Sequence, residues 1–182
     1  MRALTARLPR VMAIYPAWHG FGWAVFQGPL APHDWGVVLV KQEKNVECLN
    51  KIDEMLGRFQ PETLVLEAYE GRQSLRRSRI QRLCQAIVAL ASDRAVDVVI
   101  YTKDQIRGAF RTVGARTRHE IAQAVAHHIT PLSQHLPQKR KPWNGEDKRM
   151  SLFAAAALVL THYHLSANQL FEDLRLEMPD IA

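Results

Sequence analysis

The chain has 182 residues, of which 47% are hydrophobic and 23% are charged, as is usual for one globular domain with a full apolar core. These proportions exclude a disordered or fibrous chain, and the two cysteines, Cys48 and Cys84, lack the spacing of a zinc site. The formal net charge of +6 makes a polyanion such as DNA or RNA a candidate partner.

Three short apolar segments come first, and the few residues between them leave no room for helices. We therefore predict that they form an antiparallel meander. Further along, periodic apolar residues predict helices, and short apolar runs predict two more strands. The predicted strands are residues 10–16, 21–26, 34–40, 63–67 and 96–101. The predicted helices are residues 45–59, 76–94, 102–110, 117–129 and 146–164, with Thr102 and Thr117 as N-caps and Glu120 in a capping box.

This order of elements predicts an α/β fold in which a five-stranded mixed sheet carries helices on both faces. A Rossmann domain is excluded because neither a helix nor a glycine-rich turn follows the first strand. We expect one domain over residues 10–165, an N-terminal extension at 1–9 and a C-terminal tail at 166–182. The basic N-terminus lacks the apolar core of a signal peptide, and the longest apolar run, residues 152–160, is too short for a membrane span. With two free thiols expected to be buried, these features favour a cytoplasmic protein with no membrane partner.

Acidic residues stand at two places where metal binding or catalysis could occur. Glu67 ends an apolar run, where a carboxylate is costly unless it is paired or metal-bound, although it could equally be the first exposed residue after the strand. Glu146 and Asp147 begin the last predicted helix, where negative charge complements the helix N-terminus. In the functional interpretation, one of these two residues faces Glu67 across a metal site.

Basic residues gather in two clusters that flank these acidic positions in the sequence. Between Glu70 and Arg118, Arg and Lys outnumber Asp and Glu by seven, which accounts for the whole net charge. A solvated surface explains most such runs, but the position of these clusters favours nucleic-acid binding. The residues expected to bind nucleic acid are Arg72, Arg76, Arg77, Arg79, Arg116, Arg118, Lys139, Arg140 and Lys141.

Several segments resemble the RuvC family of Holliday junction resolvases, whose fold is RNase H-like. The family's opening strand and turn are resembled by Ala13-Ile14-Tyr15-Pro16 and by Gly20-Phe21-Gly22-Trp23-Ala24-Val25. Its glutamate-bearing strand is resembled by Leu64-Val65-Leu66-Glu67, and its last helix by residues 154–162. Residues 140–153 look closer still to a set of short bacterial RuvC-like proteins of uncertain role. The resemblance covers roughly residues 10–164 and rests on the order and spacing of all these segments.

The resemblance implies that carboxylates from the first strand, the fourth strand and the last helix hold two Mg²⁺ or Mn²⁺ ions for phosphodiester cleavage. Of that set, only Glu67 is present here. Tyr15 replaces the first-strand aspartate, and Ser151 and Ala154 stand at the acidic positions of the last helix. A neutral phenol is a poor ligand for these ions, and a methyl group is none. Asp147, predicted one helical turn before Ser151, could hold one weakly bound ion together with Glu67.

Three functions remain open from the sequence. The first is a catalytically degenerate protein that binds branched or duplex DNA, in preference to RNA, through its phosphates. The second is an active metal-dependent endonuclease that uses Glu67 with one of the paired acidic residues, with Asp34 as a further candidate. The third is a protein-interaction module in which exposed aromatic residues such as Trp18 and Trp143 contact a partner. By analogy with the family, we also expect a homodimer.

Overall fold

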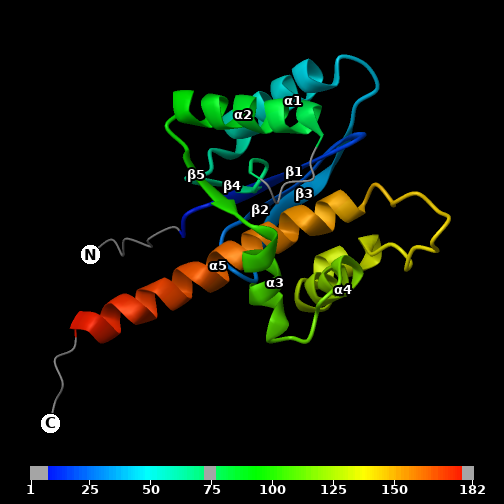
Figure 1. Ribbon diagram of the computed structural model, residues 1–182. Helices are drawn as coiled ribbons and strands as arrows, with labels where there is room; N and C mark the ends of the chain where they lie inside the picture. Colours follow the sequence, from blue (N-terminus) through cyan, green and yellow to red (C-terminus); the bar gives the residue numbers. More distant parts are fainter. Residues whose placement is uncertain (1–7, 72–76, 178–182) are drawn as a thin grey trace, which may run out of the picture.

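The structure is a computed structural model that describes residues 8–71 and 77–177, and it has helices on both faces of one sheet (Figure 1). The first three strands are β1 (Val11–Ala17), β2 (Gly20–Phe26) and β3 (Pro32–Leu39), which form the predicted antiparallel meander. β4 (Thr63–Glu67) and β5 (Asp97–Tyr101) extend the sheet in parallel to β1, so the strand order is β3-β2-β1-β4-β5. The predicted mixed five-stranded sheet is confirmed.

The helices form two layers around this sheet (Figure 1). Helices α1 (Lys44–Phe59) and α2 (Ser78–Asp93) cover one face. Helices α3 (Lys103–Arg111), α4 (Arg118–His128) and α5 (Met150–Glu177) lie on the other. Since successive side chains of a strand point to opposite faces, each central strand contributes to both hydrophobic cores.

The alternation is clear along β1. Val11 and Ala13 are buried in the core that contains α5, whereas Met12 and Ile14 are buried in the core beneath α1 and α2. The free thiols of Cys48 and Cys84 are both buried in this second core, as predicted. β1 and β4 are therefore held rigidly from both sides, which fixes the direction of the residues at their carboxyl ends.

The starts of α3 and α4 are fixed by the two predicted N-caps. Thr102 Oγ1 accepts a hydrogen bond from Gln105 N at 3.2 Å, and Thr117 Oγ1 accepts one from Glu120 N at 3.2 Å. The side chains of Gln105 and Glu120 bond back to the cap residues, so both ends are capping boxes. Backbone hydrogen bonds from Thr117 and Arg116 lower the pKa of Glu120. Each cap directly precedes a basic residue of the site described below.

α5 begins and ends later than predicted. It starts at Met150 rather than Glu146, because the residues before it form a turn in which Asp147 Oδ1 accepts a hydrogen bond from Arg149 N at 2.9 Å. An aspartate that bonds the backbone two residues on favours a turn over a continued helix. At its other end the helix continues to Glu177, so the expected boundary at residue 165 lies inside α5. The division into a domain and a tail stays a prediction.

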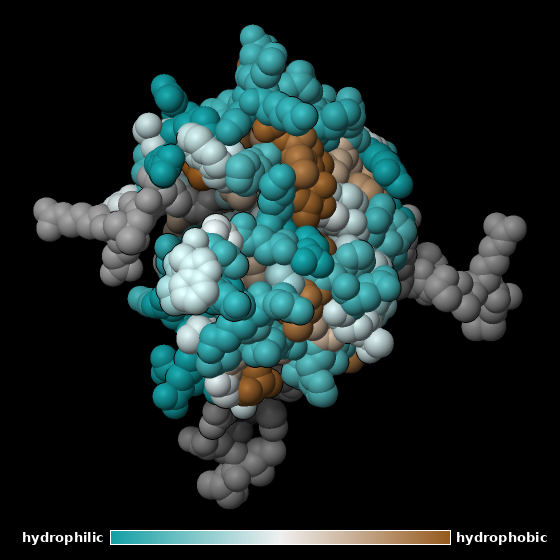
Figure 2. Space-filling view, turned by 90° about the vertical axis from the view of Figure 1, so that its right-hand side faces the viewer, coloured by the Kyte–Doolittle hydropathy of each residue, from teal (hydrophilic) through white to brown (hydrophobic). Residues whose placement is uncertain are grey.

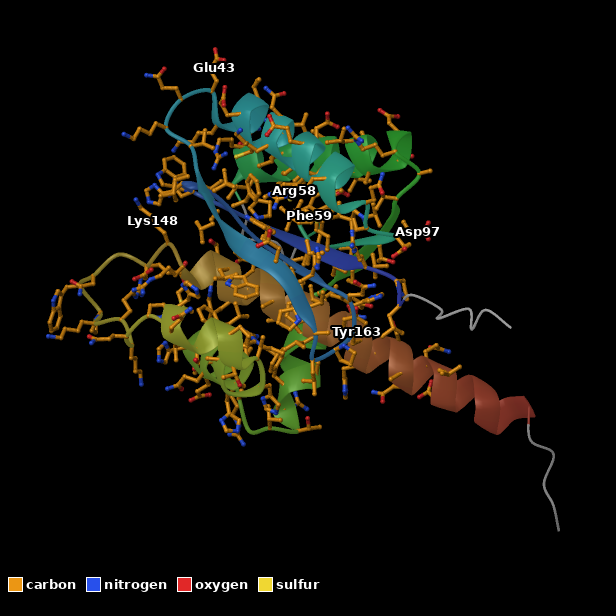
Figure 3. All side chains as sticks on the ribbon, turned by 180° about the vertical axis from the view of Figure 1, so that it is seen from behind. Glu43, Arg58, Phe59, Asp97, Lys148 and Tyr163 are labelled. Carbon is orange, nitrogen blue, oxygen red and sulfur yellow. The ribbon has the colours of Figure 1, made fainter. Side chains whose placement is uncertain are left out.

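By length and composition, residues Met150–Leu170 of α5 could cross a membrane, contrary to the expectation from the shorter run 152–160. However, 56% of the apolar stretch is buried inside the protein. Phe153 and Leu158 lie in the hydrophobic core, and the Tyr163 hydroxyl accepts a hydrogen bond from Gly28 N at 2.9 Å (Figure 3). Core helices of globular proteins can be as long and as apolar as a membrane span, so the packing of α5 accounts for its apolar character.

A half-buried pair between β5 and α5 predicts pH-dependent stability. The Tyr101 hydroxyl and His162 Nδ1 lie 2.9 Å apart, and burial lowers the pKa of His162. The unfolded chain therefore binds a proton at a higher pH, about 6.5, than the folded protein does. The contribution of His162 to stability is complete above that pH and is lost as the pH falls toward the folded-state pKa.

We expect the midpoint of thermal unfolding to fall between about pH 7 and pH 5. His162→Gln flattens this decline, because the variant has no imidazole to protonate. His127→Gln serves as the control, since His127 is exposed on α4. An unchanged decline in His162→Gln would show that other groups cause it.

Candidate functional site

The carboxyl ends of β1 and β4 lie at one edge of the sheet, because the two strands are parallel neighbours. Tyr15 from β1, Glu67 from β4 and Ala154 from α5 line the same cavity there, which has a volume of about 190 Å³. We call this the Glu67 cavity. The three positions meet in space, as the resemblance to RuvC requires.

Positive charge dominates the lining of the Glu67 cavity. Lys103 and Arg107 come from α3, Arg116 precedes α4, and Arg118 is the first residue of α4. These four residues are exposed, whereas Glu67 is only 8% exposed. Among the described residues that line the cavity, one buried carboxylate thus faces four cations.

Arg118 links this cavity to the loop before α5. Its guanidinium lies over the ring of Tyr15, 5.0 Å from the centroid, which is a cation–π contact. Its Nε lies 3.1 Å from Glu146 Oε1. Where the resemblance implies a first-strand carboxylate, this chain has a phenol ring beneath a guanidinium. Glu146 therefore contacts a cation of the Glu67 cavity, and its facing Glu67 across a metal ion stays a prediction.

Asp147 and Ser151 lie outside the Glu67 cavity and line a neighbouring hollow of about 200 Å³ beside the β1–β2 turn. The Asp147 carboxylate lies 2.7 Å from Arg149 Nη2 and 3.0 Å from Arg149 Nε, and these hydrogen bonds lower the pKa of Asp147. The Ser151 hydroxyl donates to Lys148 O at 2.7 Å. Glu67 and Asp147 line different hollows, and Asp147 is paired with Arg149, so the metal pair stays a prediction.

The donor set does not fit the two-metal site that the resemblance implies. Within residues 8–71 and 77–177, no three His, Cys, Asp or Glu side chains are grouped so that they could hold a metal ion. Asp34, the further acidic candidate, lies on β3 and contacts Arg58 of α1 at 3.5 Å. Mg²⁺ and Mn²⁺ require several hard oxygen ligands, most of them anionic. One carboxylate among four cations suits an anion such as phosphate better.

The basic residues predicted to bind nucleic acid gather around the same edge. A groove of about 1140 Å³, which we call the basic groove, shares Arg118 with the Glu67 cavity, so the two hollows adjoin. The face that carries the end of β1 and the loop before α5 is mostly hydrophilic (Figure 2). The groove is lined by Lys139, Arg140 and Lys141, and the β1–β2 turn is contacted by Arg77 and Arg79. Two further predicted residues, Arg72 and Arg76, lie outside the described residues.

The prediction of binding residues omits Lys103 and Arg107. They are four residues apart on α3, so they lie on the same face of that helix. Their spacing is visible in the sequence, directly after the strand that precedes Thr102. That this face points toward Glu67 depends on the pairing of β5 with β4, which the spacing alone does not reveal.

Solved structures that are similar to this chain include Holliday junction resolvases. RuvC of Thermus thermophilus aligns with this chain with a TM-score of 0.63 and 23% sequence identity. The alignment covers 88% of this chain and 96% of the RuvC chain. The same protein in complex with its Holliday junction substrate has a TM-score of 0.63 at 21% identity, with the same coverage. The yeast mitochondrial Holliday junction resolvase aligns with a TM-score of 0.57 and 14% sequence identity. The alignment covers 90% of this chain and 83% of the resolvase chain.

No protein-family model matches the chain, and no curated protein matches it significantly. The structural comparisons establish the fold: the chain has the α/β fold of RuvC, with a five-stranded mixed sheet. The predicted fold class is confirmed. A shared fold does not determine function, which depends on the residues of the site.

Proposed function

We propose that this protein binds branched or duplex DNA through phosphate contacts and has lost the metal-dependent cleavage that its fold type suggests. One observation carries this proposal: the Glu67 cavity holds one carboxylate and four cations where the resemblance implies a cluster of carboxylates. The structural neighbours support the choice of DNA, because one of them is in complex with Holliday junction substrate.

Phosphate contacts account for the arrangement of the cations. Arg118 belongs to both the Glu67 cavity and the basic groove, so the cations of the two hollows lie along one surface, in which Glu146 and Asp147 are paired with Arg118 and Arg149. A single DNA strand could place one of its phosphates at the mouth of the Glu67 cavity and others along the basic groove. Such contacts fix the position of the DNA without reading bases, so we expect preference for shape and little for sequence.

Glu67→Gln tests whether the cavity holds a cation or an anion. We expect affinity for a four-way junction to rise about two- to fivefold, because a carboxylate within about 10 Å of a phosphate repels it by about 0.4–1 kcal/mol in a partly hydrated site. A metal site predicts the reverse, since loss of the carboxylate would abolish metal binding. The measurement is a gel shift of the wild type and the variant, with and without Mg²⁺ or Mn²⁺.

Cleavage assays under the same conditions separate this proposal from an active endonuclease. The wild type is incubated with a junction, a duplex and a single strand in the presence of each divalent ion. We expect intact DNA throughout. Metal-dependent cuts that disappear in Glu67→Gln would contradict the proposal and establish the endonuclease. The homodimer remains a prediction, which sedimentation velocity would test.

A further inference from the structure

The turn between β1 and β2 carries an exposed tryptophan surrounded by cations. Trp18 is 49% exposed. Lys44 Nζ, Arg77 Cζ and Arg79 Cζ lie 4.2, 4.6 and 5.6 Å from the centroid of its ring. A tryptophan that serves only packing buries its ring, whereas this residue leaves about half of its surface in water. The combination of an accessible indole and three cations suits a ligand that is both aromatic and anionic.

The turn is held in place by side chains from the two helices above it. Lys44 Nζ donates to Trp18 O at 3.1 Å, and Arg79 donates to Ala17 O at 3.1 Å and to Asn45 Oδ1 at 3.0 Å. Two of these hydrogen bonds are accepted by backbone carbonyls of the turn, and the third joins Arg79 to a side chain of α1, so none of them depends on the indole. The ring is therefore presented on a rigid support, which lowers the entropic cost of binding. It can also be replaced without removing that support.

Trp18 lies beside the surface proposed to bind phosphates. It lines the 200 Å³ hollow together with Lys148 and Glu146. Lys148 lies in the turn before α5, on the side of the β1–β2 turn (Figure 3). Glu146 also lines the basic groove, so the hollow and the groove adjoin. A strand whose phosphates follow the groove would therefore bring its bases past the indole.

We propose that Trp18 is a stacking platform for an unpaired nucleobase, with the charged groups of Lys44 and Arg77, which lie over the ring in the free protein, shifting to contact the phosphates on either side. This inference rests on the proposed function and adds a means of selecting DNA structure. Bases inside a duplex are stacked on both sides and offer no free face. Bases at a branch point, in a bulge or in a single strand do, and any of the four bases can stack on an aromatic ring.

The test compares two duplexes that differ in one nucleobase. Each has a single bulged nucleotide, which carries thymine in one duplex and is abasic in the other, so the backbone charge is the same. We expect the wild type to bind the thymine bulge about 5- to 140-fold more tightly than the abasic bulge, as one stacked base implies. Trp18→Ala should abolish this ratio, and Trp18→Phe should retain most of it. Trp143→Ala is the matched control, because Trp143 is 77% exposed and its ring lies under Lys141, which lines the basic groove.

The outcomes distinguish this inference from the proposed function. A wild-type ratio near one, a ratio that persists in Trp18→Ala, or a ratio that Trp143→Ala also abolishes would overturn the stacking platform. Salt-dependent binding of the abasic bulge would still support phosphate binding in each of those cases. If neither duplex binds, both the inference and the proposed function fail. Circular dichroism of each variant confirms that the fold is kept.

Discussion

We expect the replacement of both Arg116 and Arg118 by glutamine to lower the affinity for a four-way junction about 60-fold at 0.1 M salt. The association constant of a DNA-binding protein varies with salt concentration to the power of about −0.9 for each phosphate contact. Loss of two contacts therefore lowers the association constant at about 0.1 M salt by a factor of about 10 to the power 1.8. It also makes the slope of log association constant against log salt concentration shallower by about 1.8. Fluorescence anisotropy with a labelled junction over a range of salt concentrations measures both quantities.

The control for this variant removes the same charge elsewhere. Lys51 and Arg58 lie on α1, on the face of the sheet opposite the Glu67 cavity, and both are exposed (Figure 1). The double change Lys51→Gln and Arg58→Gln should leave the salt slope unchanged. An equal loss in both double variants would show that overall charge, rather than the cavity rim, determines affinity, and it would contradict the proposed site.

Local signals in the sequence were sufficient for most of the fold. The apolar run that ends at Glu67 predicts β4 with the observed bounds, and Thr102 and Thr117 predict the capped starts of α3 and α4. Such signals depend on neighbouring residues in the chain, so they can be recognised without knowing the tertiary structure. The start of α5 was predicted four residues too early, because a helical pattern of charges does not reveal that the Asp147 side chain bonds the backbone.

The site was predictable where the resemblance fixed one position per element, as for Tyr15, Glu67 and Ala154, which do line one cavity. Contacts between segments that are distant in the sequence could not be predicted. Arg118 covers the ring of Tyr15, and Lys44 lies over the ring of Trp18, although each pair is far apart in the sequence. Sequence spacing cannot reveal such pairs, because they depend on how α4 and α1 pack against the sheet. The charge of the cavity therefore became clear only from the structure.

The other large effect concerns Gly22, in the middle of β2. It pairs with Tyr15 on one side and with Val37 on the other, and α5 crosses directly over it. A Cβ atom at this position would lie 2.1 Å from Ser151 C and 2.4 Å from Leu152 N. Both are backbone atoms of the first turn of α5, so no side-chain rotation relieves the clash. Gly22→Ala must displace either the strand or the helix.

We expect Gly22→Ala to destabilise the protein by at least about 3 kcal/mol, at the upper end of the usual cost of overpacking, and to lower the thermal midpoint by at least about 6–12 °C. Gly108→Ala is the matched control. Gly108 lies within α3, nothing is within 4 Å of its added Cβ, and alanine there should stabilise the helix by about 0.5–1 kcal/mol. A Gly22→Ala variant as stable as the wild type would show that α5 does not approach β2 this closely.

The same contact explains why glycine belongs at this point of the sequence pattern. Gly22 belongs to the run Phe21-Gly22-Trp23-Ala24, which is part of one of the segments that resemble the RuvC family. Its lack of a side chain brings the start of α5 onto the sheet, and Ala154 one turn later then faces the Glu67 cavity. Any Gly22→Ala protein that still folds should therefore bind DNA more weakly, because α5 and the loop before it, with Glu146 beside Arg118, are displaced together.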